Sequence, residues 1–164
     1  MSQDAVSLGS LIHEDMVYFD VEAETWQDVV RILAGHAIEH GYAVEGYAED
    51  VIEREELYPT GLPTDVMKVA IPHAMVQDHV KEAAIVVGKL AQPVDFKEMG
   101  DGENDVPVEM VYMLVAKGDK HHLAVLQQLI SVFATPEFMA ELKTVEDPAS
   151  LKATLIDLAG KVVL

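Results

Sequence analysis

Two runs of consecutive apolar residues in the middle of the chain, Ala83–Val87 and Val111–Ala116, set the strongest limit on its fold. Both are much shorter than the ~20 residues that a membrane-spanning helix needs, so we expect no membrane insertion. Short apolar runs bounded by polar or turn residues are typical of buried strands. The sequence therefore predicts strands over Ala83–Leu90 and Val106–Ala116.

The remaining elements follow from apolar periodicity and from turn residues. Further strands are expected over Leu11–Val21, Val66–Ile71 and, as a short or edge strand, Val94–Met99, with a turn at Gly100–Gly102. Helices are expected over Thr25–His40, Gly46–Leu57, His121–Phe133, Pro136–Leu142 and Pro148–Leu158. Thr25 and Asp147 are the expected N-caps. Two prolines and a glycine predict a loop over Tyr58–Asp65.

This order of elements predicts a single α/β domain over residues 1–164. The sequence contains no internal repeat, low-complexity tract or Ser/Gly linker that would divide it. Half of the residues are hydrophobic, enough to build a core. Helices at both ends and strands between them favour one mixed β-sheet flanked by helices on both faces.

Charge and composition exclude several classes of function. The chain has 11 Lys and Arg against 29 Asp and Glu, a formal charge of −18, which disfavours nucleic acid and anionic membranes and favours basic protein partners. It has no cysteine, which excludes disulfides and thiolate chemistry. Met1–Asp4 begins no signal peptide, so a cytoplasmic protein is expected. Glycine-loop nucleotide motifs are also missing.

His73 is the main candidate for chemistry. It follows the apolar segment Val69–Ile71 directly after Pro72, which ends the strand because proline cannot donate to a ladder. A neutral imidazole there is a nucleophile near neutral pH, since the ordinary pKa of histidine is about 6.5. The alternative is that His73 is only the polar residue that ends a strand.

Other candidate residues have equally plain alternatives. His122 is placed to project from the first turn of a helix towards the sheet edge, whereas His121 is expected to face solvent. Arg54 is either a donor to phosphoryl oxygens or a helix charge paired with Asp50. His36 and His40 are four residues apart, but no third ligand is evident, so surface histidines explain them as well as a metal site does.

Together these motifs resemble the enzyme IIA domain of the sugar phosphotransferase system, fructose/mannitol type. The ordered motifs are Arg54-Glu55, Thr60-Gly61-Leu62, Val69-Ala70-Ile71-Pro72-His73, Pro93-Val94-Asp95-Phe96, Val111–Ala116 and His122-Leu123-x-x-Leu126. They extend over most of the chain. The stretches Tyr58–Thr64 and Pro93–Gly100 look most like galactitol-type members.

The resemblance implies a fold and a phosphoryl relay. The fold would be that of a phosphotransferase/anion-transport-protein-like domain. His73 matches the histidine that takes a phosphoryl group from phospho-HPr and passes it to an enzyme IIB partner, which works with a membrane enzyme IIC. His122 matches the histidine that helps to hold the phosphoryl oxygens, and Arg54 matches the arginine near the site, as a phosphoryl or partner contact. No metal, cofactor or nucleotide is required.

The sequence departs from the family pattern in two places. Lys68 stands where many members have glycine, and it either adds a cation near the phosphoryl group or faces solvent. Thr60-Gly61-Leu62 replaces the Ser-Thr pair of mannitol-like members, which favours a galactitol-like or other polyol specificity. Two alternatives remain: a regulatory protein phosphorylated at His73 that signals to a kinase, channel or transcription regulator, and an acidic domain whose histidines have no task.

Overall fold

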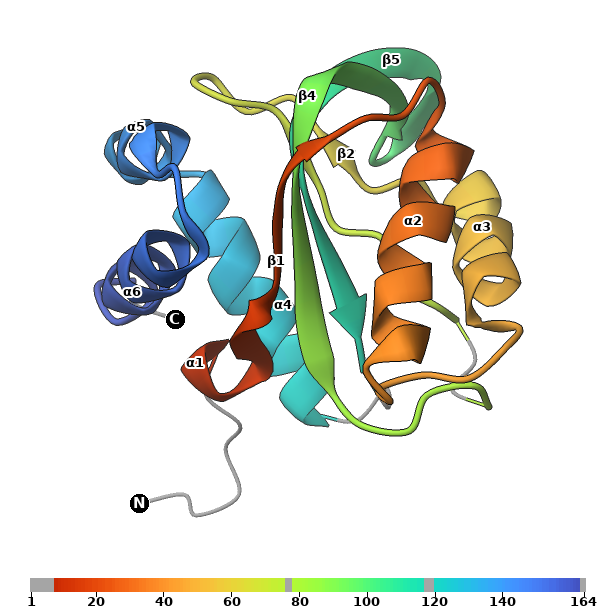
Figure 1. Ribbon diagram of the computed structural model, residues 1–164. Coiled ribbons are helices and arrows are strands. Elements are labelled where there is room, and N and C mark those ends of the chain that lie inside the picture. Colours follow the sequence, from red (N-terminus) through yellow and green to blue (C-terminus); the bar gives the residue numbers. More distant parts are fainter. Residues whose placement is uncertain (1–7, 76–77, 117–119, 163–164) are drawn as a thin grey trace.

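The computed structural model describes residues 8–75, 78–116 and 120–162, apart from the side chains of residues 120–122. Within them, five strands form one mixed sheet: β1 (Ile12–Val21), β2 (Gly61–Leu62), β3 (Val69–Ala70), β4 (Ala84–Glu98) and β5 (Asp101–Val115). One face carries α2 (Trp26–Glu39) and α3 (Tyr47–Leu57). The other carries α1 (Leu8–Leu11), α4 (Lys120–Phe133), α5 (Pro136–Thr144) and α6 (Pro148–Ala159) (Figure 1). This confirms the expected α/β fold with helices on both faces.

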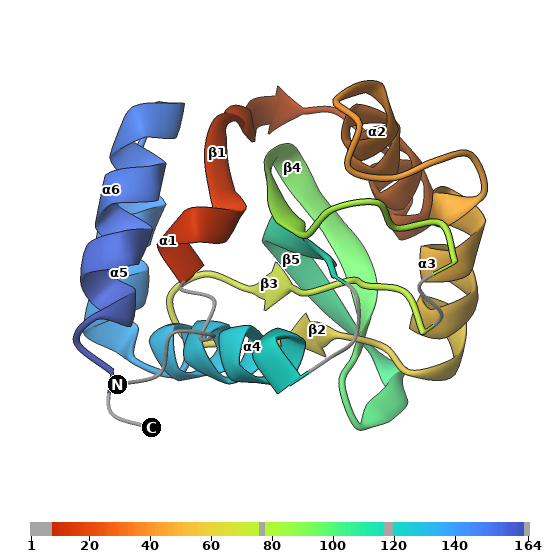
Figure 2. The same cartoon turned by 90° about the horizontal axis from the view of Figure 1, so that it is seen from below.

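Strand β4 organises the sheet. It forms a long antiparallel hairpin with β5 and pairs in parallel with β1. β3 runs parallel to β5, and the two-residue strand β2 joins β3 to the end of β4. In Figure 2 the sheet lies between the α2–α3 pair and the helices α4, α5 and α6. The carboxyl ends of β3 and β5 therefore lie at one edge of the sheet, where β3 leads towards His73 and β5 leads towards α4.

Four strands differ from expectation. β4 is one continuous strand over the two expected segments, and a register shift between Lys89 and Val94 absorbs Pro93, which has no N–H for the ladder. The strand expected over Val66–Ile71 covers only Val69–Ala70, and β5 begins already at Asp101, inside the expected turn. Gly61–Leu62, expected in a loop, forms β2 because it reaches partners on two other strands.

The longer helices agree with the sequence to within one or two residues, and their caps explain where two of them begin. The Thr25 hydroxyl accepts a hydrogen bond from the Asp28 amide at 3.2 Å. The Asp147 carboxylate accepts one from the Ser150 amide at 2.8 Å, and this bond lowers the pKa of Asp147. Both bonds satisfy amides that the first turn leaves without a helical partner. The short helix α1 was not expected.

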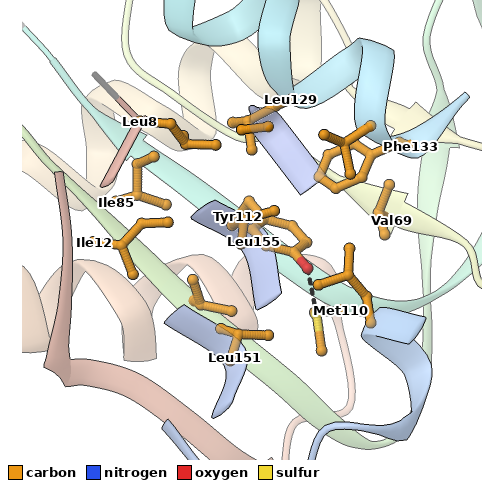
Figure 3. Close-up of a cluster of buried hydrophobic side chains, with 14 of the residues drawn as sticks. Leu8, Ile12, Val69, Ile85, Met110, Tyr112, Leu129, Phe133, Leu151 and Leu155 are labelled. Atoms are coloured by element: carbon orange, nitrogen blue, oxygen red, sulfur yellow. Dashed lines mark hydrogen bonds between the residues drawn. The ribbon is translucent and has the colours of Figure 1, made fainter. Parts of the chain in front are cut away.

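Two apolar clusters, one on each face of the sheet, form the core. Alternate residues of β5 divide between them: Met110, Tyr112 and Leu114 pack towards α4 and α6, whereas the intervening valine and methionine residues pack towards α2 and α3. Figure 3 shows the first cluster, with Tyr112 at its centre. Because both faces are covered, a strand here is apolar at every position, which explains the continuous run Val111–Ala116.

No single helix in the described residues is long and apolar enough to cross a membrane. One bent pair of helices, Leu123–Phe133 and Pro136–Thr144, has the length and composition of a membrane span, with an angle of 90° between the two helices. In this structure the apolar sides of both helices belong to the core, through residues such as Leu129 and Leu142.

Candidate functional site

Besides the tyrosines of the core, three polar side chains are buried among the described residues: Glu55, Thr60 and His73, with exposed fractions of 3%, 1% and 6%. They come from three segments, namely the last turn of α3, the connection to β2, and the residues after β3. Burying a polar group costs free energy unless it finds hydrogen-bond partners. These three groups find them in one another and in the backbone between them.

Hydrogen bonds join the three side chains into one network. Glu55 accepts from the Thr60 amide at 2.8 Å and from the Thr60 hydroxyl at 2.9 Å. The same hydroxyl oxygen accepts from the amide of Ile71 at 3.1 Å. The carbonyl of Ile71 lies 2.8 Å from Nδ1 of His73. The buried carboxyl of α3 is therefore connected, through one threonine and one backbone residue, to the histidine that the sequence singles out.

The ring of His73 has a defined tautomer in this arrangement. A carbonyl oxygen only accepts, so Nδ1 carries the hydrogen and donates it to Ile71. Nε2 of a neutral ring then carries the lone pair and is the nucleophilic atom. The next carbonyl, that of Pro72, accepts from the amide of Leu114 on β5 at 3.0 Å. The backbone before His73 is thus held by Thr60 at Ile71 and by β5 at Pro72.

Gly61 is required where the network meets the sheet. Its carbonyl accepts from the amide of Met99 at 2.8 Å. A Cβ at this position would stand 2.6 Å from the backbone oxygen of Lys97, a contact that cannot be relieved by turning a side chain. The absence of a side chain lets β2 pair with β4, and that pairing holds the neighbouring Thr60 against Glu55.

Burial controls the protonation of Glu55. It raises the pKa of this carboxyl to about 7, against the opposing effects of its two hydrogen bonds from Thr60 and of the Arg54 charge. The ionised carboxylate is the form that accepts both the amide and the hydroxyl hydrogen of Thr60. These hydrogen bonds therefore lower the pKa of Glu55, whereas burial raises it. Near neutral pH both protonation states of Glu55 are therefore populated.

This pKa predicts a pH dependence of stability. The folded protein holds a proton on Glu55 up to about pH 7, whereas an unfolded glutamate releases it near 4.5, so stability falls as the pH rises through this window. The contribution is about 3 kcal/mol. We expect the unfolding free energy of the wild type minus that of Glu55→Gln to decrease by this amount between pH 4.5 and 7.5. Urea denaturation of both proteins across this pH range measures the difference.

The matched control for this measurement is Glu53→Gln, an exposed glutamate on the same helix. Its stability is expected to follow that of the wild type across the same pH range. A difference between wild type and Glu55→Gln that stays constant with pH would contradict the raised pKa.

Arg54 has different partners from those considered in the sequence. Its guanidinium donates to the carbonyl of Tyr58 at 2.9 Å and lies 5.6 Å from the centre of the Tyr58 ring. Burial is the main cause that lowers the pKa of Arg54. The pairing with Asp50 is wrong, because Asp50 instead holds Nδ1 of His79 at 2.6 Å and so raises the pKa of that histidine.

A groove of about 870 Å³ opens beside the network. Glu55 and Thr60 belong to its wall, but His73 does not, so the groove meets the network at its Glu55–Thr60 end. The wall includes two exposed apolar side chains, Leu57 and Tyr58, and two cations, Arg54 and Lys97. Lys97 is paired with Asp105 at 2.7 Å. The α2, α3 and α4 helices and the β4–β5 hairpin all contribute to this wall.

The structure describes the remaining candidates to different extents. His122 lies in the first turn of α4, where the chain leaves the sheet edge that also carries His73, but its side chain and that of His121 are outside the described residues. Lys68 is half-buried and donates to the carbonyl of Thr64 at 3.3 Å, so it neither faces solvent freely nor is shown near His73.

The histidine pair of α2 has its own neighbours. The His36 ring stacks on Tyr18 with 3.8 Å between ring centroids, and Nδ1 of His40 bonds the carbonyl of His36 at 2.9 Å. Burial lowers the pKa of His36. In the described part of the chain, no three His, Asp or Glu side chains gather in a way that would hold a metal ion.

Sequence reasoning missed the roles of Glu55 and Thr60, although both stand in the motifs that carried the resemblance. The available signal was the spacing Glu55-x-x-x-x-Thr60, at a helix end followed by a Pro/Gly loop. Nothing in that spacing identifies Ile71 as the next partner, because the bond is made only when β3 is laid beside β2.

Comparisons with known proteins agree on one family. Residues 10–157 match the family model described as "Phosphoenolpyruvate-dependent sugar phosphotransferase system, EIIA 2". The galactitol-specific EIIA component of Escherichia coli K12 is 26% identical over 120 residues, which are 73% of this chain and 79% of that protein.

Solved structures show the same fold. The complex of enzyme IIAMTL and phosphorylated enzyme IIBMTL from Escherichia coli matches with a TM-score of 0.72 and 18% identity, over 89% of this chain and 97% of that one. The nitrogen regulatory protein IIA-Ntr from Neisseria meningitidis matches with a TM-score of 0.74 and 23% identity, over 90% and 97%.

Proposed function

The chain belongs to the EIIA 2 family of the phosphoenolpyruvate-dependent sugar phosphotransferase system, whose members are phosphotransferase components that carry a phosphoryl group, and from this premise we propose that His73 carries it. The observation that supports this assignment is the buried network. His73 alone among the histidines with described side chains is buried, and its Nδ1 faces a carbonyl that only accepts.

The proposed step is an in-line phosphoryl transfer. The lone pair on Nε2 of His73 forms a bond to phosphorus while the bond between phosphorus and the donor nitrogen breaks, and that electron pair returns to the donor. Such a transfer depends mainly on positioning and charge stabilisation. Nδ1 keeps its hydrogen and donates it to the Ile71 carbonyl throughout, so the ring is held in one orientation.

Charge stabilisation must be local, because a phosphoryl group enters a protein with a formal charge of −18. We assign part of it to His122, on the basis of its motif and the position of its helix turn at the same sheet edge as His73. Arg54, which is engaged with Tyr58 at the groove, is assigned to partner contact.

The proposed partners are phospho-HPr as donor and an enzyme IIB as acceptor, which passes the group on to a sugar or polyol that a membrane enzyme IIC transports. The similar IIAMTL structure is a complex with phosphorylated IIBMTL, which supports a IIB partner. The galactitol-specific relative supports a galactitol-like polyol as the first substrate to test. We also propose that the protein acts in the cytoplasm with these partners.

The test is a relay built from purified components. The chain is mixed with phosphoenolpyruvate, enzyme I and HPr, and phosphate label is followed by gel and mass spectrometry. We expect one acid-labile phosphoryl group, which is lost when galactitol-type enzyme IIB is added. A chain that takes no label, beside a known enzyme IIA that does, would refute the proposal.

The regulatory alternative predicts a different result when enzyme IIB is added in the same experiment. A regulator would accept the label at His73 but keep it when enzyme IIB proteins of galactitol, mannitol and fructose type are added in turn. The likeness to a nitrogen regulatory IIA structure concerns the fold alone and does not separate the two. Transfer to any of these IIB proteins would favour the transport carrier.

A further inference from the structure

We propose that Glu55 is a positioning residue for His73, acting through Thr60 and Ile71, so that Nε2 is the ring atom presented for phosphoryl transfer. This inference rests on the proposed function of His73. It concerns a group that never touches the phosphoryl group in the proposed step, because Glu55 reaches His73 only through two other residues.

The direction of every hydrogen in the network is set by the backbone. The amides of Thr60 and Ile71 only donate, so Glu55 Oε2 accepts from the first and the Thr60 hydroxyl oxygen accepts from the second. The hydroxyl hydrogen then points to Glu55 Oε1. At the other end the Ile71 carbonyl only accepts, so Nδ1 of His73 donates. This order of donors leaves a neutral ring with its lone pair on Nε2.

Ile71 transmits position because it has little freedom of its own. Its side chain is fully buried in the cluster between the sheet and α4. The following Pro72 restricts Ile71 to extended backbone conformations and has a fixed φ. The carbonyl of Pro72 is itself held by Leu114. If the Thr60 hydroxyl no longer accepts the hydrogen bond from the Ile71 amide, the segment that carries the Ile71 carbonyl loses the contact that joins it to α3.

Glu55 is well suited to hold Thr60, because the helix that carries Glu55 is itself fixed to the sheet. It lies in the last turn of α3, and that helix is fixed at its other end by Tyr47, which is fully buried and donates to the carbonyl of Leu114 at 3.4 Å. Leu114 thus contacts both α3 and Pro72. Helix α3, β5 and the segment before His73 form one closed set of contacts.

The test compares four variants of the full chain. Glu55→Gln keeps the size of the side chain but replaces one acceptor by a donor, and Thr60→Val removes the hydroxyl at nearly constant volume. Thr60→Ser keeps the hydroxyl and is the rescue variant. Glu53→Gln, an exposed glutamate on the same helix, is the control.

Two readouts separate positioning from general damage. The first is the rate of phosphoryl acceptance, from phospho-HPr and also from phosphoramidate, a small donor that needs no docking surface. We expect Glu55→Gln and Thr60→Val to be slowed on the order of 10²-fold with both donors, the loss that misplacement by about an ångström causes. The second is the ¹⁵N chemical shifts of the His73 ring, which report the share of the Nδ1–H tautomer. We expect this share to fall in the same two variants and to be retained in Thr60→Ser and Glu53→Gln.

Failure of this inference and failure of the proposed function have different signatures. If the wild type accepts phosphate and folded Glu55→Gln and Thr60→Val do so at its rate, with unchanged ring shifts, Glu55 has no positioning role while His73 remains the carrier. If the wild type accepts no phosphate, the carrier function fails, and the ring shifts still decide whether Glu55 sets the tautomer. Should Glu55→Gln not fold, the comparison of Thr60→Val with Thr60→Ser makes the same decision.

Discussion

Replacing His73 with glutamine is expected to abolish phosphoryl acceptance, with a loss in rate on the order of 10³-fold or more, because the atom that forms the bond to phosphorus is removed. Glutamine is polar and of similar size, so its amide can still donate to the Ile71 carbonyl. The fold should therefore survive, which circular dichroism and thermal unfolding would verify. The measurement is acid-labile label after incubation with phosphoenolpyruvate, enzyme I and HPr.

The control is His40→Gln, an exposed histidine at the end of α2, which should take up label at the wild-type rate. Label that persists on His73→Gln would assign the carrier role to another residue, and peptide mapping would then identify it. His122→Ala provides a graded comparison. If His122 only holds the phosphoryl oxygens, this variant accepts label slowly, whereas His73→Gln accepts none.

Replacing Tyr112 with alanine is expected to lower the free energy of unfolding by about 3–5 kcal/mol, the range for removing a buried aromatic ring. Tyr112 is fully buried in the cluster of Figure 3, with its ring centroid 4.8 Å from that of Phe133 on α4. Its hydroxyl donates to the sulfur of Met110 at 2.7 Å. The ring fills the space between the sheet and α4, so its loss leaves a cavity that the packed strands cannot collapse into.

Urea denaturation followed by circular dichroism measures this effect, and Leu123→Ala on α4 is the control. Leu123 has an exposed fraction of 54%, so its truncation should change stability by no more than about 0.5 kcal/mol. Tyr112→Phe separates the ring from the hydroxyl, since it removes only the contact with Met110. A loss below about 1 kcal/mol for Tyr112→Ala would show that the cluster between the sheet and α4 repacks.

The layers of the fold were predictable from local pattern. Continuous apolar runs indicated strands buried on both faces, and the segments Ala84–Gly88 of β4 and Met110–Val115 of β5 are buried at every residue. The helix starts followed from Thr25 and Asp147, whose side chains make the expected bonds to backbone amides three residues on. These features were accessible because their physical causes lie within a few residues of one another in the chain.

The strand boundaries near the site were less accessible. β2 and β3 are each two residues long, and neither has an alternation of its own that would mark it as a strand. Their pairing depends on the close approach of Gly61 to Lys97, which involves a residue from another strand. For strands this short, the neighbouring strands decide the outcome more than intrinsic propensity does.

The sequence by itself determined the layer order, the helix caps, the family to which the chain belongs and the candidacy of His73 after Pro72, because each depends on residue types at short or ordered spacings. Only the tertiary structure decided what surrounds that histidine. The hydrogen bonds that join Glu55, Thr60 and Ile71 depend on which segments the sheet brings together. The same is true of the partners of two charged residues of α3, because Asp50 pairs with His79 and Arg54 donates to Tyr58. A hydrogen bond forms only over about 3 Å, so its partner is known only when the fold has set the distance.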